Sequence, residues 1–331
     1  MPTPRVALAH LPTPVEPMDR LGAALGFDPG ELWVKRDDCT GLAGGGNKAR
    51  KLEYLCADAL AQGCDTLVTG GGAQSNHARM TAAAANKLGL GCTIVLAADE
   101  EVPAGNVVLD VVLGAEIVWA GPLGYRATEA AIEGAYARLA AAGRRPYLMP
   151  IGGATVVGAL GYVDAADELV AQLPDVDLVV VAGGSGGTHA GLVAGLGDHA
   201  KVLGVNVGAR RDLAEAVSLK AAEVADLRGR PSPSGTVQVD DARVGAGYGM
   251  ATQDGGDALE MTARLEGLIL DPVYTAKAMA GLIAARRDGR IAPGQRVVFL
   301  HTGGMPALFA TGHRALSESP GSPPAPPSSP S

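Results

Sequence analysis

Lys48 stands directly after a glycine loop and at the start of a helical pattern. Residues 44–46 are all glycine, which adopts almost any backbone conformation and lets a ligand approach the main chain closely. Apolar residues recur at helical spacing over residues 49–60, so Lys48 is expected near a helix N-terminus. The free N–H groups and the positive end of the dipole there would lower the pKa of its ammonium. Such a lysine is a candidate for Schiff-base formation, the alternative being an ordinary surface lysine on a loop.

A second glycine loop, residues 183–187, follows a β-branched run and precedes a helical pattern. The backbone N–H groups of such a loop, with the dipole of the following helix, can bind an anion. The G-x-G-x-x-G spacing is missing because His189 fills the third glycine position, and no Gly-Lys-Ser/Thr follows. The loop therefore argues against dinucleotides and nucleoside triphosphates and favours a single phosphate. The alternative is a loop whose glycines serve only helix–sheet packing.

A third loop leads from residue 70 to Ser75, Asn76 and His77, where another helical pattern begins. Ser75 or Asn76 can cap that helix, and a lone histidine near a helix start is commonly structural. Alternatively, the helix start binds a substrate carboxylate, Asn76 contacts a ring or hydroxyl, and His77 orients the substrate or relays a proton. A lysine, a phosphate loop and a carboxylate site together suit pyridoxal 5′-phosphate (PLP), which performs carbanion chemistry on amino acids.

The elements that position these loops alternate between short β-branched runs and alanine-rich helical patterns. This alternation predicts parallel sheets with helices on both faces. Three of the expected strands end in glycines, and ligands of open α/β sheets lie beyond the carboxyl ends of strands, so one site built from several junctions is expected. The expected strands are 66–69, 93–97, 116–119, 177–182, 202–207 and 296–300, and the expected helices, besides 49–60, are 76–88, 106–113, 128–142, 159–173, 214–227, 256–265 and 276–287.

The composition excludes some classes of function. A chain of 331 residues with 47% hydrophobic residues can build one large domain or two lobes. A net charge of −8 argues against nucleic acid and anionic membranes as partners. The four cysteines form no CxxC pair, no metal site is expected, and we see no signal peptide or membrane-spanning run. A cytoplasmic protein with free thiols is therefore expected. The tail, residues 317–331, is mostly Ser and Pro and is expected to be disordered.

Seven motifs, in chain order, make the sequence resemble a known family. It resembles the fold-type-II PLP enzymes related to tryptophan synthase β, and within them the D-cysteine desulfhydrase / 1-aminocyclopropane-1-carboxylate (ACC) deaminase family. The resemblance runs from about Leu11 to Phe309. The motifs are WVKRDD at 33–38, GGNKARKLE at 45–53, QSNH at 74–77, SGGTHAG at 185–191, GYG at 247–249, LDPVYT at 270–275 and HTGG at 301–304.

The resemblance implies a role for each matching residue. Lys48 would form the Schiff base with the cofactor, and Asn76 would lie against the hydroxyl of the cofactor ring. Ser75 and His77 would face the substrate carboxylate and the reacting carbon. The resemblance further implies that two tyrosines, Tyr248 and Tyr274, flank the substrate. It implies that the cofactor phosphate is held by Ser185, Gly186, Gly187 and Thr188. The partner of the pyridine nitrogen would be Thr302.

The same resemblance implies the architecture, which is two α/β lobes with parallel sheets flanked by helices. The large, PLP-binding lobe would take residues 1–50 and 162–316, and the small lobe residues 51–161. The cofactor would lie in the cleft between them, where ligand sites often occur. A homodimer is also implied.

Two threonines bear on the reaction. ACC deaminases carry Glu after the tyrosine of the Asp-Pro-Val-Tyr motif and Leu in the His-x-Gly-Gly motif, whereas this chain has Thr275 and Thr302, as desulfhydrases do. A carboxylate near the ring nitrogen favours its protonation and a strong electron sink, which helps to open a cyclopropane that has no α-hydrogen. A neutral hydroxyl makes a weaker sink, which is adequate for β-elimination of a sulfur leaving group.

The resulting hypothesis is a D-cysteine desulfhydrase that converts D-cysteine to pyruvate, sulfide and ammonia. L-cysteate sulfo-lyase and ACC deaminase are the alternatives within the family. A non-catalytic PLP-binding protein is a further alternative, opposed by the presence of Lys48, Tyr248 and Tyr274. A Rossmann oxidoreductase is opposed by the missing dinucleotide fingerprint.

Overall fold

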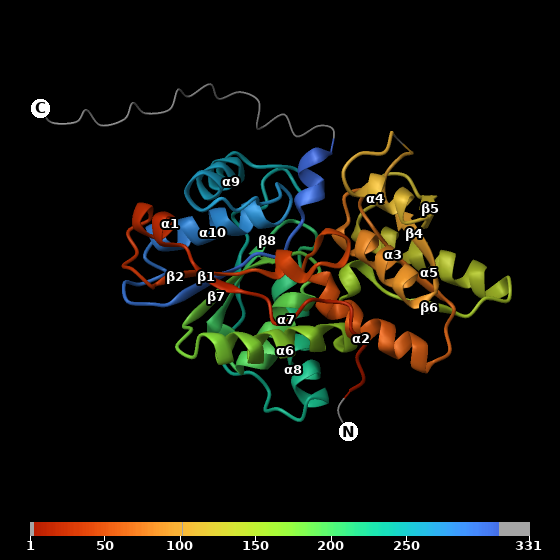
Figure 1. Ribbon diagram of the computed structural model, residues 1–331, viewed down its shortest axis with the longest axis horizontal. Helices are drawn as coiled ribbons and strands as arrows, with labels where there is room; N and C mark the ends of the chain where they lie inside the picture. Colours follow the sequence, from red (N-terminus) through yellow and green to blue (C-terminus); the bar gives the residue numbers. More distant parts are fainter. Residues whose placement is uncertain (1–2, 101, 311–331) are drawn as a thin grey trace, which may run out of the picture.

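The computed structural model describes residues 3–100 and 102–310, whose strands form two sheets (Figure 1). The strands of the larger sheet are β1 (Val15–Pro17), β2 (Leu32–Lys35), β7 (Leu178–Gly183), β8 (Val202–Asn206), β9 (Gln238–Asp240) and β10 (Val297–Leu300). They lie in the order β1-β2-β10-β7-β8-β9, and β1 is antiparallel to its neighbour while the other pairs are parallel.

The smaller sheet is wholly parallel, with the order β5-β4-β3-β6. Its strands are β3 (Thr66–Gly71), β4 (Gly91–Leu96), β5 (Glu116–Trp119) and β6 (Pro146–Leu148). Three helices, α2 (Lys48–Ala61), α3 (Asn76–Leu88) and α4 (Asn106–Val112), pack on one face. Helix α5 (Tyr125–Ala141) packs on the other face, where Ile132 contacts the strand residues Val68 and Val95.

Helices cover both faces of the larger sheet (Figure 1). One face carries α1 (Asp19–Ala24), α9 (Gln253–Glu266) and α10 (Thr275–Arg287), and the other carries α6 (Val156–Gln172), α7 (Gly187–Leu196) and α8 (Leu213–Leu227). The central strand β7 supplies Val180 to the first core and Val179 and Val181 to the second. A parallel strand that is buried on both faces is a continuous apolar run, as here. Short 3₁₀ helices occur at η1 (Asp37–Thr40), η2 (Leu42–Gly44), η3 (Ile151–Gly153), η4 (His199–Lys201) and η5 (Met305–Phe309).

The chain crosses between the sheets twice. It forms β1 and β2, enters the smaller sheet through α2, and returns to the larger sheet through α6. The two crossing helices pack together, because Tyr54 of α2 shares a core with Leu160 and Val163 of α6. The predicted lobe boundaries, at 50/51 and 161/162, fall inside these two helices. The division into lobes stays a prediction, and its last residues, 311–316, lie outside the described residues, as does the predicted tail, 317–331.

The predicted fold class is confirmed, and each expected strand and helix is present with ends shifted by a few residues. Four strands, β1, β2, β6 and β9, and helix α1 were not predicted. Three of these strands have only three residues, which is too short for an alternating pattern to show. No helix in the described ranges is long and apolar enough to cross a membrane.

Candidate active site

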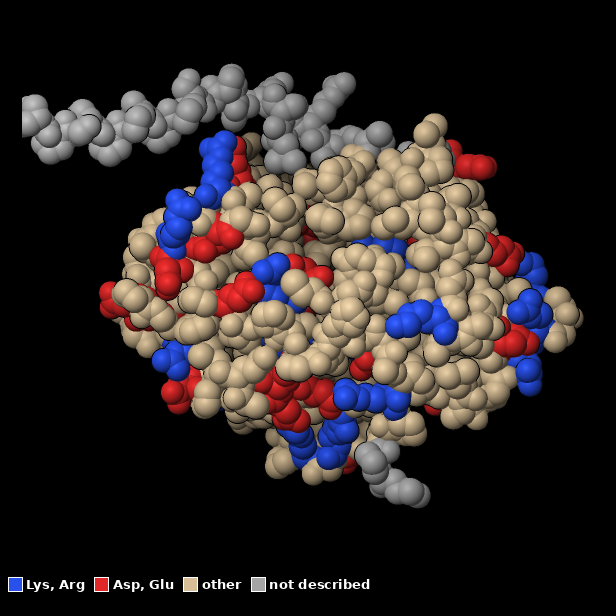
Figure 2. All heavy atoms as spheres, viewed as in Figure 1, with Lys and Arg blue, Asp and Glu red and all other residues tan. Residues whose placement is uncertain are grey.

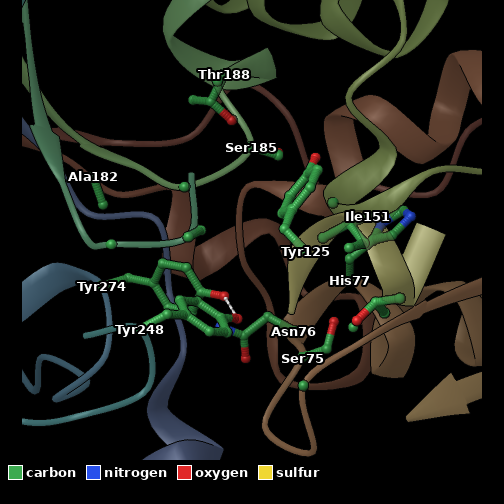
Figure 3. A pocket seen from close by; sticks show the side chains of 18 of the residues that line it. Ser75, Asn76, His77, Tyr125, Ile151, Ala182, Ser185, Thr188, Tyr248 and Tyr274 are labelled. Atoms are coloured by element: carbon green, nitrogen blue, oxygen red, sulfur yellow. Dashed lines mark hydrogen bonds between the residues drawn. The ribbon is translucent and has the colours of Figure 1, made fainter. Parts of the chain in front are cut away.

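A cavity of about 320 Å³ lies at the carboxyl ends of β3, β7, β8 and β10. The three glycine-bearing strand ends that were expected to share one site all line it, at Gly71, Gly184 and Thr302. Ten of the eleven predicted site residues line this cavity and Gly187 does not; the ten are Lys48, Ser75, Asn76, His77, Ser185, Gly186, Thr188, Tyr248, Tyr274 and Thr302. Figure 3 shows Ser185 and Thr188 at one end of the cavity and Asn76 with the tyrosines at the other.

Lys48 is the first residue of α2 and reaches the cavity from its glycine loop. Gly45 has a φ of +75°, and a Cβ there would lie 1.8 Å from the carbonyl oxygen of Asp38, so no other residue fits without a shift. The backbone N–H of Asn47 donates to the carbonyl of Thr302 at 3.0 Å, which ties the loop to the end of β10. Burial lowers the pKa of Lys48 to about 8, so roughly a tenth of the amine is neutral at pH 7, far more than for an ordinary lysine.

A second lysine, Lys51, lies one turn further along α2 and is fully buried. Its Nζ donates to the carbonyl of Gly152 at 3.0 Å, and a Cβ built on Gly187 would come within 2.6 Å of it. Burial and the neighbouring charge of Lys48 hold the pKa of Lys51 well below its usual range. Sequence reasoning missed this residue, although its spacing of three from Lys48 places both on one side of a helix.

The glycine loop after β7 has the geometry of an anion site. Gly186 has a φ of +87°, and α7 begins at the next residue, so its first N–H groups are directed toward the loop. Ser185 and Thr188 are nearly buried, and Thr188 Oγ1 accepts a hydrogen bond from Asn47 Nδ2 at 3.0 Å. A Cβ built on Gly152 would lie 2.6 Å from Ser185 Oγ and 3.8 Å from Lys48 Nζ. The space between the amine and the loop is therefore kept open by a glycine, which fits a group carrying both an aldehyde and a phosphate.

The start of α3 contributes three residues. Ser75 Oγ accepts the N–H of Ala78 at 3.2 Å, so its capping role is real although the residue also lines the cavity. Asn76 Oδ1 accepts from Asn106 Nδ2 at 2.9 Å, which leaves the amide N–H groups of Asn76 as the donors it can offer to the cavity. His77 is buried, and neither ring nitrogen has a hydrogen-bond partner among the described residues. Burial, with the charges of both lysines, lowers the pKa of His77 far enough to keep it neutral.

Tyr248 and Tyr274 face each other across one side of the cavity, where their hydroxyls are hydrogen-bonded (Figure 3). Their ring centroids are 6.0 Å apart with planes at 69°. Burial raises the pKa of both phenols, and the hydrogen bond between them opposes that rise at Tyr248 by favouring its phenolate. Tyr274 is fixed by Asp271, whose carboxylate accepts the N–H groups of Val273, Tyr274 and Thr275 at 2.9 Å each.

Tyr125 also lines the cavity and was not predicted. It begins α5 on the smaller sheet, and the guanidinium of Arg210, from the loop after β8, lies 5.6 Å from its ring centroid. Burial raises the pKa of Tyr125 to about 12. This cation–π contact joins the two sheets at the cavity, and no local sequence signal reveals it because the partners are far apart in the chain.

Thr275 differs from expectation. It is fully buried and does not line the cavity, since its hydroxyl donates to Asp271 Oδ1 at 2.7 Å. Of the two threonines that were compared with ACC deaminases, only Thr302 lines the cavity. Arg79 is also buried and donates to Asn106 Oδ1 and to the carbonyl of Gly45, so it packs behind the glycine loop.

A lysine and an anion loop that face one cavity, at the carboxyl ends of parallel strands, define the class of a PLP-dependent enzyme. Residues 6–303 match the family model described as pyridoxal-phosphate dependent enzyme. The chain belongs to this family, and its cofactor is PLP.

Curated relatives and solved structures agree with the resemblance. The chain is 43% identical over 321 residues to a D-cysteine desulfhydrase of Klebsiella pneumoniae subsp. pneumoniae, covering 93% of this chain and 96% of the relative. It is 42% identical over 322 residues, with the same coverage, to a D-cysteine desulfhydrase of Salmonella typhi. A crystal structure described as an ACC deaminase homologue superposes with a TM-score of 0.85 at 37% identity, covering 92% of this chain and 93% of that one. A threonine deaminase isoform of Solanum lycopersicum shares the fold, with a TM-score of 0.61 at 20% identity, covering 88% of this chain and 79% of that one.

Proposed function

We propose that this enzyme is a PLP-dependent lyase that converts D-cysteine to pyruvate, sulfide and ammonia. One observation carries the proposal: a lysine amine with a lowered pKa shares a single cavity with a hydrogen-bonded tyrosine pair, in a chain that resembles D-cysteine desulfhydrases over nearly its whole length. An amine that is partly neutral can accept a proton, and a neutral phenol can donate one.

The residues around the cavity divide the work of holding the cofactor. Ser185, Gly186 and Thr188 would hold the phosphate, with Gly187 supplying a backbone N–H at the start of α7. The amide of Asn76 would donate to the ring hydroxyl, and Thr302 would lie at the ring nitrogen. When bound, PLP supplies an electron sink for negative charge at the substrate Cα.

The remaining residues would act on the substrate. The start of α3, at Ser75 and His77, would bind the carboxylate. Lys48 Nζ would take the α-proton, since holding base and substrate together in the cleft is a main source of rate acceleration. The Cβ–S bond then breaks, and the tyrosine pair would supply the proton that the sulfur leaves with as hydrogen sulfide. The released enamine would hydrolyse to pyruvate and ammonia.

ACC deaminase remains a second candidate, favoured by the solved structure described as its homologue. Thr275 is turned away from the cavity. The argument that a neutral hydroxyl near the ring nitrogen favours β-elimination over ring opening therefore depends on Thr302 alone. L-cysteate sulfo-lyase is a third candidate, in which sulfite would replace sulfide as the leaving group.

The deciding experiment is a parallel assay of the purified enzyme with D-cysteine, L-cysteine, L-cysteate and ACC. We expect pyruvate and sulfide from D-cysteine in excess over every other product. Pyruvate with sulfite from L-cysteate would keep the mechanism and change the substrate, whereas oxobutyrate from ACC as the main product would refute the proposal.

Three further properties are proposed on the family resemblance and the sequence. The enzyme would be a homodimer, with a small amino acid as substrate. A cytoplasmic location is supported by the four cysteines, which are all free thiols in the structure. On the face drawn in Figure 2, acidic and basic side chains are intermingled, which gives no support for a nucleic-acid partner on that face.

A further inference from the structure

Tyr248 lies in a glycine-rich loop, residues 244–250, between β9 and α9. Gly245, Gly247 and Gly249 have φ values of +66°, +145° and +79°, which only glycine adopts readily. Among the described residues, one backbone hydrogen bond closes on the loop itself, from Met250 N to Gly247 O at 3.4 Å. Glycine loses much conformational freedom on ordering, so an anchor outside the loop must hold Tyr248 against its partner.

That anchor is Lys277, which is fully buried on α10. Its Nζ donates to the carbonyls of Val244 at 2.8 Å and Gly247 at 3.1 Å, both in the loop. A third carbonyl, of Val207 at the end of β8, lies 3.5 Å away. An ammonium has three N–H donors, and three carbonyls therefore satisfy it. Its neighbours on the helix are alanines and a methionine, and burial lowers the pKa of Lys277, which the charges of Asp254 and Asp271 oppose. The buried charge is therefore offset by direct contact with the carbonyl dipoles and by these two more distant carboxylates.

The three carbonyls belong to segments that also touch one another. The chain turns at Gly208 with a φ of +89°, and a Cβ there would lie 3.0 Å from the backbone nitrogen of Tyr248 and 2.8 Å from Val244 Cγ1. Tyr274 precedes Lys277 by three residues, at the start of the same helix. One side chain thus connects the loop that carries Tyr248 to the helix that carries Tyr274.

We propose that the Lys277 ammonium is a built-in cation that orders the Tyr248 loop and thereby sets the contact between the two tyrosines. Lys277 does not line the cavity, so it is a positioning residue. The inference rests on the proposed function only for the role given to the tyrosine pair. Because the partners are backbone carbonyls, a dehydrated potassium ion is the natural replacement for the ammonium, as in protein sites where carbonyl dipoles replace the hydration shell of the ion.

The first test measures hydrogen exchange by mass spectrometry on the full-length, PLP-loaded enzyme without substrate. Lys277→Met keeps the length of the side chain and removes the charge, and amide exchange over residues 244–250 should accelerate about tenfold or more. Leu282→Ala is the matched control, because it truncates another fully buried side chain of α10 that packs in the sheet core and does not contact the loop. Unchanged exchange in Lys277→Met, or equal acceleration in Leu282→Ala, would overturn the proposal.

The second test isolates the charge. In Lys277→Ala, potassium chloride should slow exchange of the loop relative to tetramethylammonium chloride at equal ionic strength, since the larger ion cannot enter. The parent enzyme should show no such difference. Equal exchange of Lys277→Ala in both salts would mean that packing alone holds the loop, and the cation role would be wrong. If the parent enzyme does not turn over D-cysteine, the proposed function is refuted. The results of both exchange tests would still apply to the role of Lys277.

Discussion

At the scale of single residues, the burial of Lys48 has a direct chemical consequence. Its side chain lines the cavity, and burial lowers its pKa to about 8. Reduction of the PLP-loaded enzyme with borohydride should fix the cofactor covalently to the peptide that contains Lys48. Lys48→Ala should lose this mass increase and lower turnover by at least about a thousandfold.

The exposed Lys87 of α3 provides the control, and Lys87→Ala should keep both the labelling and the activity. Covalent labelling at another lysine in Lys48→Ala would show that the Schiff-base lysine has been misassigned.

The tyrosine pair yields a prediction about ionisation. The hydrogen bond from Tyr274 favours the phenolate of Tyr248, so Tyr274→Phe should raise the pKa of Tyr248 further above its ordinary value of about 10. Tyrosinate absorbance in an alkaline titration, taken as the difference from Tyr248→Phe, measures this shift. Each Phe variant should also lower kcat, by roughly ten- to a thousandfold, if the pair supplies the proton to the sulfur. An unchanged titration would mean that the hydroxyls do not share a proton in solution.

The residues at the site divide into those that sequence reveals and those that it hides. Lys48, the 183–187 loop and the Ser75–His77 motif were found because each combines a local pattern with a known chemistry. Lys51 and Lys277 were missed because a buried lysine is not visible in a sequence until its acceptors are known. Tyr125 contacts Arg210, which is far away in the sequence, and such a tertiary contact has no local pattern.

At the scale of elements, the first turn of α10 contributes to both stability and activity. The Asp271 carboxylate accepts three backbone N–H groups at the N-terminus of the helix and also accepts the Thr275 hydroxyl. Asp271→Ala would leave these buried groups without a partner and should lower the free energy of unfolding by about 2 kcal/mol or more. Since Tyr274 is the residue before the helix, kcat should fall as well.

Asp198→Ala is the control for that prediction, because Asp198 caps the short helix η4 far along the chain from the tyrosines. It should cost about 1 kcal/mol or less and leave kcat unchanged. A fall in stability without a fall in kcat for Asp271→Ala would separate the cap from the position of Tyr274.

Elements were predictable from sequence where they were long and periodic. The helix at 76–88 was predicted from the helical spacing of its apolar residues, and the buried strand at 177–182 from its continuous apolar run. The edge strands β1 and β9 could not be found in this way, because three residues gain their strand conformation from pairing with a neighbour. The direction of the Thr275 side chain could not be predicted either, since it depends on a hydrogen bond to Asp271 within the same motif, which residue spacing alone does not reveal.

At the scale of the whole molecule, a buried ionic network joins the helices that cross between the sheets to the larger sheet. Arg50 of α2 binds Asp37 and Glu168, and Glu168 of α6 also binds Lys35 of β2. Burial alone would raise the pKa of Glu168, but Arg50 and Lys35 outweigh it and lower the pKa to about 2. The network therefore fixes α2, and with it Lys48, relative to the larger sheet.

The sign of this shift sets an acid-stability prediction. The folded pKa of Glu168 lies below the unfolded value of about 4.3, so its contribution is complete above pH 4.3 and is lost as the pH falls toward 2. Glu168→Gln should cost about 3–5 kcal/mol at pH 7, because Lys35 loses its carboxylate partner and Arg50 keeps only that of Asp37, and clearly less near pH 2.5. Urea unfolding over this pH range measures the difference. The exposed pair of Asp175 and Arg296 is the control, and Asp175→Asn should change stability by less than about 1 kcal/mol at either pH.

The chain crosses from the larger sheet to the smaller one and back only once in the described ranges, through α2 and α6. As a result, the starts of α3 and α5 lie in one continuous segment of the chain, while the anion loop, Tyr248 and Tyr274 lie outside it. The two ends of that stretch are adjacent in space because α2 and α6 pack together. Two crossovers, one in α2 and one in α6, would therefore exchange the part of the enzyme that would meet the substrate carboxylate and leave the part that would hold the phosphate unchanged.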